Sequence, residues 1–182
     1  MLLGFGPDGH LLVVACGRSR VTVWDLTSGT VLSYLYDSPT QAVACAFSPD
    51  GAKVAVGGFD GAIRLSNPQT GEMIREIRGG LAAVWDLSFS PDGERLACAD
   101  LRGGVTLWDA ATSELLWLYR ERYGYLSVDV GGLGESVAYG SLTNGAGLVD
   151  PASGARRPLA GADQSRRGHR DGCGRPPSRG RL

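Results

Sequence analysis

Residues 47–51 read Phe-Ser-Pro-Asp-Gly, and this stretch organises the chain because it recurs. The same five residues stand at 89–93, and the related Phe-Gly-Pro-Asp-Gly stands at 5–9. The prolines of the three copies are therefore 42 residues apart at each step. Each copy leads to a hydrophobic segment that ends at an equivalent position, as in Trp24-Asp25 and Trp108-Asp109. The chain is thus built on an internal repeat of fixed length.

One copy of the repeat contains four short strand signals. Val43, Cys45 and Phe47 alternate with small residues, which is the period-two spacing of a strand with one buried face. Turns at 48–51, 59–61 and 67–71 separate the segments that follow, and Asp-Gly in the second turn is a strong hairpin signal. A repeat of about 40–45 residues is typical of a propeller blade. The sequence therefore predicts an all-β fold, a partial β-propeller of about four four-stranded antiparallel blades.

The predicted blades span residues 1–40, 41–82, 83–125 and 126–160. The last blade is eroded, because Gly-Gly-Leu-Gly replaces the Ser-Pro-Asp-Gly turn. Its outermost strand would fall near 155–160, where two arginines and a proline stand. A proline removes a ladder hydrogen bond, so this segment is expected to be a weak edge strand at best.

Residues 161–182 form an arginine-, glycine- and proline-rich tail that is predicted to be disordered, because it has too few apolar residues to bury. Residues 156–182 hold eight arginines and two acids, whereas the preceding residues hold ten basic and seventeen acidic groups. The tail is interpreted as a basic arm for nucleic acid or an acidic surface, as a solvated tail, or as translation out of frame. We favour the last two, so nucleic acid is not expected as a partner.

Cysteine usage and hydropathy indicate a cytoplasmic protein. The four cysteines form no C-x-x-C pair, so neither a disulfide framework nor a zinc site is expected. No signal peptide is evident, and no apolar run approaches the roughly 20 residues of a membrane helix. We therefore expect a reduced, cytoplasmic chain without a membrane segment, a cofactor or a metal.

The repeated motif resembles the WD-repeat (WD40-type) family of β-propellers over about residues 1–160. The motif is Phe-Ser-Pro-Asp-Gly, then small residues, then Ile/Val-x-Leu/Val-Trp-Asp, then x-Thr-x-Gly. The intact Ser-Pro-Asp-Gly turns resemble the bacterial form of the repeat. The family's Gly-His pair is replaced by Gly79-Gly80 and by Asp37-Ser38, so its histidine, serine, aspartate and tryptophan network is broken. Asp60 keeps the hairpin aspartate, but Arg18 and Arg102 take its place elsewhere.

Blade number is the larger departure from the family. Its rings usually have about seven blades, and a full ring removes exposed edges. About four blades would leave two open edges, each able to template pairing with another chain. The chain is therefore either a fragment or one part of a ring completed by a second copy or another protein.

No arrangement of side chains predicts catalysis. His10, the one histidine before the tail, follows an Asp-Gly turn and is expected to be a solvated loop residue. The aspartates of the Pro-Asp-Gly turns recur with the repeat, which favours a turn role, and Asp25 and Asp109 are expected to cap turns. Trp24, Trp85 and Trp108 are predicted to be core residues.

The resemblance implies a non-enzymatic protein-interaction scaffold. In such propellers the fourth-to-first strand connections and the second-to-third hairpins share one face, where partners commonly bind. Tyrosine and arginine are over-represented in binding hot spots. The candidate contact residues for a protein or peptide partner are Arg18, Arg20, Asp60, Arg102, Arg120, Arg122, Tyr123 and Tyr125. The alternative is a truncated remnant of a larger WD-repeat signalling protein without independent function, and a propeller enzyme is the least favoured.

Overall fold

The computed structural model describes residues 2–15, 20–37, 40–78, 82–120, 126–132, 135–141 and 145–159. In these ranges the chain folds into four four-stranded antiparallel sheets, each made of consecutive strands. This confirms the predicted all-β partial propeller. No helix in the described ranges is long and apolar enough to cross a membrane.

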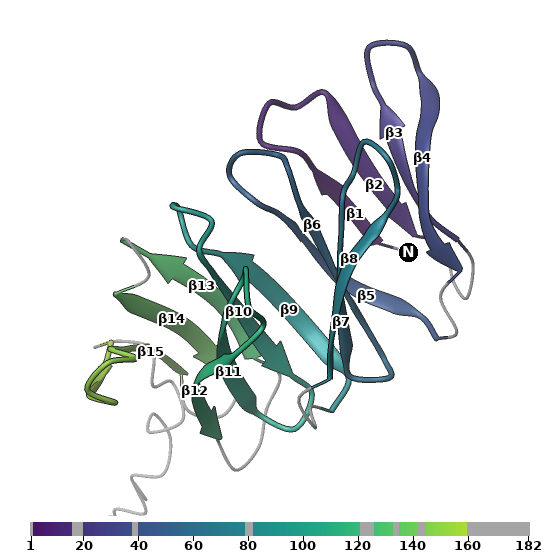
Figure 1. The fold of residues 1–182 in the computed structure, drawn as a ribbon. Coiled ribbons are helices and arrows are strands. Elements are labelled where there is room, and N and C mark those ends of the chain that lie inside the picture. Colours follow the sequence, from purple (N-terminus) through teal and green to yellow (C-terminus); the bar gives the residue numbers. More distant parts are fainter. Residues whose placement is uncertain are drawn as a thin grey trace, which may run out of the picture.

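The four sheets, called blades 1 to 4, stand side by side in a curved row (Figure 1). Blade 1 contains β1 (Leu2–Phe5), β2 (Leu11–Ala15), β3 (Arg20–Asp25) and β4 (Thr30–Asp37). Blade 2 contains β5 (Ala42–Phe47), β6 (Val54–Gly58), β7 (Ala62–Ser66) and β8 (Met73–Arg78). Blade 3 contains β9 (Val84–Phe89), β10 (Arg95–Asp100), β11 (Gly104–Asp109) and β12 (Leu115–Arg120). Blade 4 contains β13 (Leu126–Gly131), β14 (Ser136–Ser141), β15 (Gly145–Val149) and the short, exposed β16 (Arg156–Pro158).

The repeated turns form as their residues predict. In blade 2 the Asp50 Oδ1 atom accepts the Ser48 hydroxyl at 2.6 Å and the Ala52 N–H at 3.0 Å. Gly51 follows with a φ of 68°, a left-handed conformation that favours glycine. The turn at Asp92 in blade 3 repeats these contacts. The recurring aspartates therefore fix turns.

The aspartates at the ends of the third strands also cap turns, as predicted. Asp25 Oδ1 accepts the Thr27 N–H at 2.8 Å, and Asp109 Oδ1 accepts the Thr112 N–H at 2.7 Å and the Ala111 N–H at 2.9 Å. These backbone hydrogen bonds lower the pKa of both carboxyl groups. A carboxylate that is bonded in this way to its own turn holds the chain reversal between the third and fourth strands.

The hydrophobic core is divided among the three blade-to-blade interfaces. Val13 and Val23 of blade 1 cluster with Val54 of blade 2. Leu65 of blade 2 clusters with Phe89 of blade 3, and a third cluster joins blades 3 and 4. A sheet buries both of its faces only when another blade packs on each side. Blades 1 and 4 stand at the ends of the row, so each of them leaves one sheet face open. The predicted open edges are therefore better described as open faces.

Two tryptophan predictions need correction. Trp85 is 38% exposed, because Val84 takes the core position at 0% exposure and the β9–β10 register shifts between Ala99 and Asp100. Trp24 is only half-buried, since no described residue covers its face of blade 1. Trp108 is buried as predicted, at 5% exposure.

Candidate protein-interaction surface

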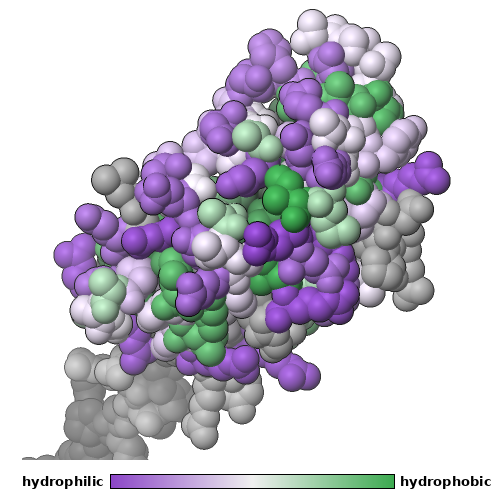
Figure 2. All heavy atoms as spheres, in the orientation of Figure 1, coloured by the Kyte–Doolittle hydropathy of each residue, from purple (hydrophilic) through white to green (hydrophobic). Residues whose placement is uncertain are grey.

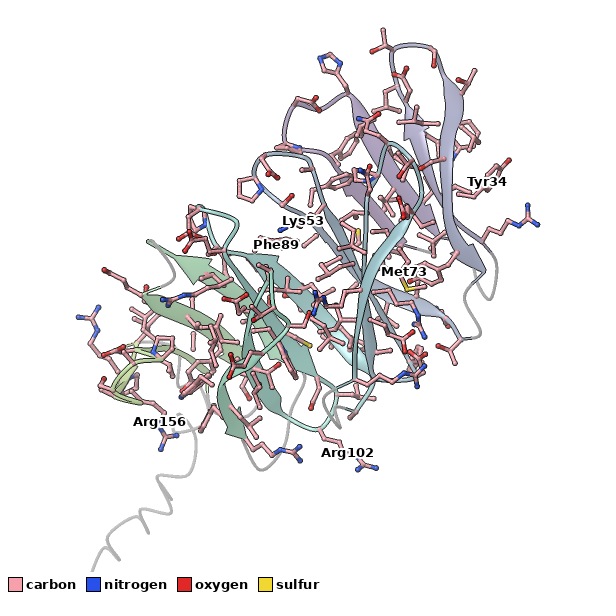
Figure 3. The ribbon with its side chains drawn as sticks, viewed as in Figure 1. Tyr34, Lys53, Met73, Phe89, Arg102 and Arg156 are labelled. Atoms are coloured by element: carbon pink, nitrogen blue, oxygen red, sulfur yellow. The ribbon has the colours of Figure 1, made fainter. Side chains whose placement is uncertain are left out.

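Hydrogen bonds place the second-to-third-strand hairpins beside the connections between blades. The Phe59 N–H donates to the Gln41 carbonyl at 3.0 Å in blade 2. The Leu101 N–H donates to the Ala83 carbonyl at 2.9 Å in blade 3. Hairpins and connections thus share one end of the molecule, here called the loop face, which comprises residues 40–41, 59–61, 82–83 and 101–103. Figure 3 shows Arg102 at this end and Lys53 at the opposite end.

A buried arginine organises the loop face of blade 2. Arg64 on β7 is 4% exposed, and its Nη2 lies 2.6 Å from Asp60 Oδ2. Its Nε donates to Glu76 Oε2 on β8 at 3.1 Å, and the other Glu76 oxygen accepts from Arg78. Burial alone would raise the pKa of Asp60, but the hydrogen bonds from Arg64 and from the Ala62 N–H, together with the charge of Arg64, outweigh burial and lower the pKa. Asp60 therefore neutralises a buried charge as well as holding its hairpin.

The same arginine ties blade 2 to blade 1. Its guanidinium carbon lies 5.2 Å from the ring centroid of Tyr36 on β4, within the range of a cation–π contact. Burial raises the pKa of Tyr36 to about 12, so the phenol is neutral. Arg64 is not among the residues predicted from the sequence, although an arginine at a strand position facing another sheet is a recognisable signal of a buried ion pair.

A different aspartate holds the corresponding hairpin of blade 3. Asp100 is 1% exposed, and its Oδ1 accepts the N–H groups of Arg102 and Gly104, each at 2.8 Å. Thr106 stands where blade 2 has Arg64, so no buried guanidinium needs a carboxylate at position 102. The repeat predicted the hairpin aspartate at position 102, whereas the residue that holds the hairpin is Asp100, two positions earlier. Arg102 itself is exposed.

The predicted contact residues in the described ranges lie at the loop-face end of the blades, Asp60 and Arg102 in hairpin turns and Arg20 and Arg120 at strand ends. Arg120 pairs with Gly104 across β11 and β12, which brings it to the same end of blade 3 as Arg102, and both side chains are exposed. Arg20, at the start of β3, lies over the Tyr34 ring with its guanidinium carbon 5.4 Å from the centroid. The predicted residues that lie outside the described ranges are Arg18, Arg122, Tyr123 and Tyr125.

The opposite end of the blades carries a groove that repeats with the sequence. Between blades 2 and 3, an opening of about 420 Å³ is lined by Lys53, Glu94 and Asp109. Between blades 3 and 4, an opening of about 560 Å³ is lined by Arg95 and by residues that include Glu135 and Asp150. Each groove thus places one basic residue opposite acids of the next blade.

Neither catalytic nor metal-binding geometry appears in the described ranges. His10 is exposed, and its Nδ1 lies 3.4 Å from the Thr27 hydroxyl. No group of three His, Cys, Asp or Glu side chains there is arranged to hold a metal ion. Burial raises the pKa of Cys45 to about 11 and also raises that of Cys98, which makes both thiols poor nucleophiles.

Hydrophobic side chains also remain on the outer strands. Figure 2 shows them among the polar groups over β8 and β12. Met73 and Ile74 on β8 are 46% and 48% exposed, and Leu116 on β12 is 46% exposed. Single exposed apolar residues are normal on a protein surface, so these outer strands define no separate site.

The blades and loop face define a repeat protein of the β-propeller class. The family model described as "WD domain, G-beta repeat" matches residues 30–66 and 71–109. These two stretches are WD40 repeats. The first begins with β4 and ends with β7, so a sequence repeat joins the outer strand of one blade to three strands of the next.

A curated relative is the "Periodic tryptophan protein 2 homolog" of the yeast Schizosaccharomyces pombe, 31% identical over 77 residues. The match covers 42% of this chain and 9% of the relative.

Proposed function

We propose that this chain is a non-enzymatic, cytoplasmic protein-interaction scaffold that binds a protein or peptide on its loop face. WD repeats generally support protein–protein interaction, which favours this function over catalysis. The observation that carries the proposal is the exposure of Arg102 and Arg120 at the same end of blade 3. Arg78 occupies the equivalent position of blade 2 and is 67% exposed.

The loop-face arginines favour a partner segment with acidic side chains. A guanidinium binds a carboxylate through two parallel hydrogen bonds, which gives geometry as well as charge. Arg64 cannot take this role, because Asp60 and Glu76 already occupy it. We also propose that the chain associates with itself to complete a ring.

The test compares Arg102→Gln/Arg120→Gln with Lys53→Gln at the opposite end. Tagged full-length chains would capture partners from a cell extract, with quantitation against the unmodified chain. Removal of two hot-spot arginines should weaken capture of specific partners by at least about tenfold. The Lys53 variant should capture them as the unmodified chain does. Equal capture by all three chains would contradict binding on the loop face.

A further inference from the structure

The interface between blades 2 and 3 shows what the two faces of a blade pack against. The face of blade 3 toward blade 2, called the near face, buries large residues, and Phe89 marks it in Figure 3. The face of blade 2 toward blade 3, called the far face, presents small and aliphatic residues; a Cβ on Gly57 would clash with Val84. The near-face residues include Val84, Leu87, Phe89, Leu96, Cys98, Thr106, Trp108 and Ala110, and the far-face residues include Ala44, Ala55, Gly57, Ile63, Leu65 and Ile77.

Five residues of the near face of blade 1 repeat those of blade 3, whereas Val14 and Leu26 stand where blade 3 has Cys98 and Ala110. Leu3, Phe5, Leu12, Thr22 and Trp24 stand 84 positions before their identical counterparts. Their exposure differs sharply, since Phe5 is 67% exposed and Phe89 only 8%. Leu3 is 51% exposed, against 5% for Leu87. Blade 1 therefore presents near-face residues that no described residue covers.

The far face of blade 4 repeats that of blade 2 on its middle strands, whereas Ser127 and Asp129 replace Ala44 and Ala46 on its inner strand. Ala138, Gly140 and Leu148 match Ala55, Gly57 and Leu65 at a spacing of 83, and Ala146 replaces Ile63. These blade 4 residues are half-buried, whereas their blade 2 counterparts are buried. A shallow depression of about 290 Å³ lies over this face, lined in part by Ala138, Gly140 and Ala146.

A polar contact follows the same pattern. Ser33 on β4 donates to the Pro68 carbonyl of blade 2 at 2.6 Å. Arg75, at the equivalent position of β8, donates from Nη1 to the Thr112 carbonyl of blade 3 at 2.9 Å. In blade 4 this position, opposite Leu148, is held by the exposed Arg157. Blade 4 thus presents a donor for a carbonyl in the third-to-fourth-strand turn of a following blade.

We infer that the far face of blade 4 in one copy packs on the near face of blade 1 in a second copy. Arg157 then donates to a backbone carbonyl in the partner's turn at residues 26–29. The inference rests on the proposed self-association and gives it two surfaces. The contact joins unlike faces, so two such contacts close a two-copy ring of about eight blades.

The experiment measures the solution mass of the full chain and of one variant on each face. Phe5→Asp places a charge on the near face, and Ala138→Arg places one in the far-face depression. The unmodified chain should be a dimer, and each variant alone should be a monomer. An equal mixture of the two variants should form a heterodimer at high concentration, because one contact then joins two unmodified faces.

A monomeric unmodified chain would overturn the inference, as would two variant chains that stay monomeric when mixed. A dimer that persists in Ala138→Arg but not in Phe5→Asp would show that two near faces pair with each other. That result would also overturn the inference. Circular dichroism shows whether Ala138→Arg folds. If it does not fold, Arg157→Ala tests the far face in its place and should weaken the dimer several-fold. Arg102→Gln/Arg120→Gln should remain dimeric, so failure of loop-face binding and failure of self-association are distinguishable.

Discussion

The hydroxyl of Ser127 on β13 donates to Asp86 Oδ2 on β9 at 2.7 Å. The Val128 N–H donates to the same oxygen at 3.0 Å. In the opposite direction, the Ser88 hydroxyl on β9 donates to Asp129 Oδ1 on β13 at 2.8 Å. These contacts join the inner strands of blades 3 and 4. Blade 4 is therefore held by polar contacts as well as by its apolar cluster.

Asp86→Ala should loosen blade 4 more than Asp129→Ala does. The first variant removes two hydrogen bonds across the interface, and the second removes one. Loss of a charged acceptor should lower the free energy of unfolding by about 2–3 kcal/mol. Hydrogen exchange of the β13 and β14 amides would locate the effect. Equal protection of these amides in both variants would contradict the account.

Asp60→Arg should destabilise the chain strongly, because it places a second guanidinium beside the buried Arg64. We expect a loss of about 3 kcal/mol or more in urea unfolding. Adding Arg64→Thr removes the buried guanidinium, as Thr106 does in blade 3, and should recover part of the loss. The exposed Arg102→Ala serves as a control within about 0.5 kcal/mol of the unmodified chain. No recovery in the double variant would mean that Asp60 acts through its hairpin alone.

Ser113→Gly should stabilise the chain. Ser113 has a φ of 63°, at the turn position where blade 2 has Gly71 with a φ of 76°. Its hydroxyl is also buried without a hydrogen-bond partner. Relief of the left-handed strain should add about 1 kcal/mol, measured as a rise in Tm.

The reverse change, Gly71→Ala, is the matched comparison. It should lower Tm, because its Cβ would also clash with the Tyr34 carbonyl oxygen. A Tm unchanged by Ser113→Gly would show that the strain at this turn is negligible.

Stability should fall as the turn aspartates are protonated. The hydrogen bond from Ser48 lowers the pKa of Asp50 below its usual 3.8, and Ser90 does the same for Asp92. A carboxyl whose pKa is lowered by folding contributes stability above its unfolded value, and this is lost as pH falls through the folded pKa. The loss should therefore begin below about pH 4.

The pH effect would be read from urea unfolding at neutral pH and in acid. Asp50→Asn/Asp92→Asn should show a smaller difference between the two conditions, because asparagine keeps the turn acceptor but does not titrate. An unchanged difference would assign the acid sensitivity to other groups.

Local chemistry explains which features the sequence predicted. Asp50 and Gly51 act within their own turn, so the turn could be predicted from neighbouring residues. Asp100 and Trp85 depend on the β9–β10 register shift and on packing between sheets, which no short stretch of sequence reports. The exposure of Phe5 needed the structure, because its sequence context closely resembles that of the buried Phe89.

The most direct test of the whole account is the solution mass of the unmodified full chain by light scattering. Four blades packed in register, with one open near face and one open far face, predict a discrete species of twice the 19.1 kDa chain mass. A discrete species at the mass of one chain would contradict the pairing of these faces.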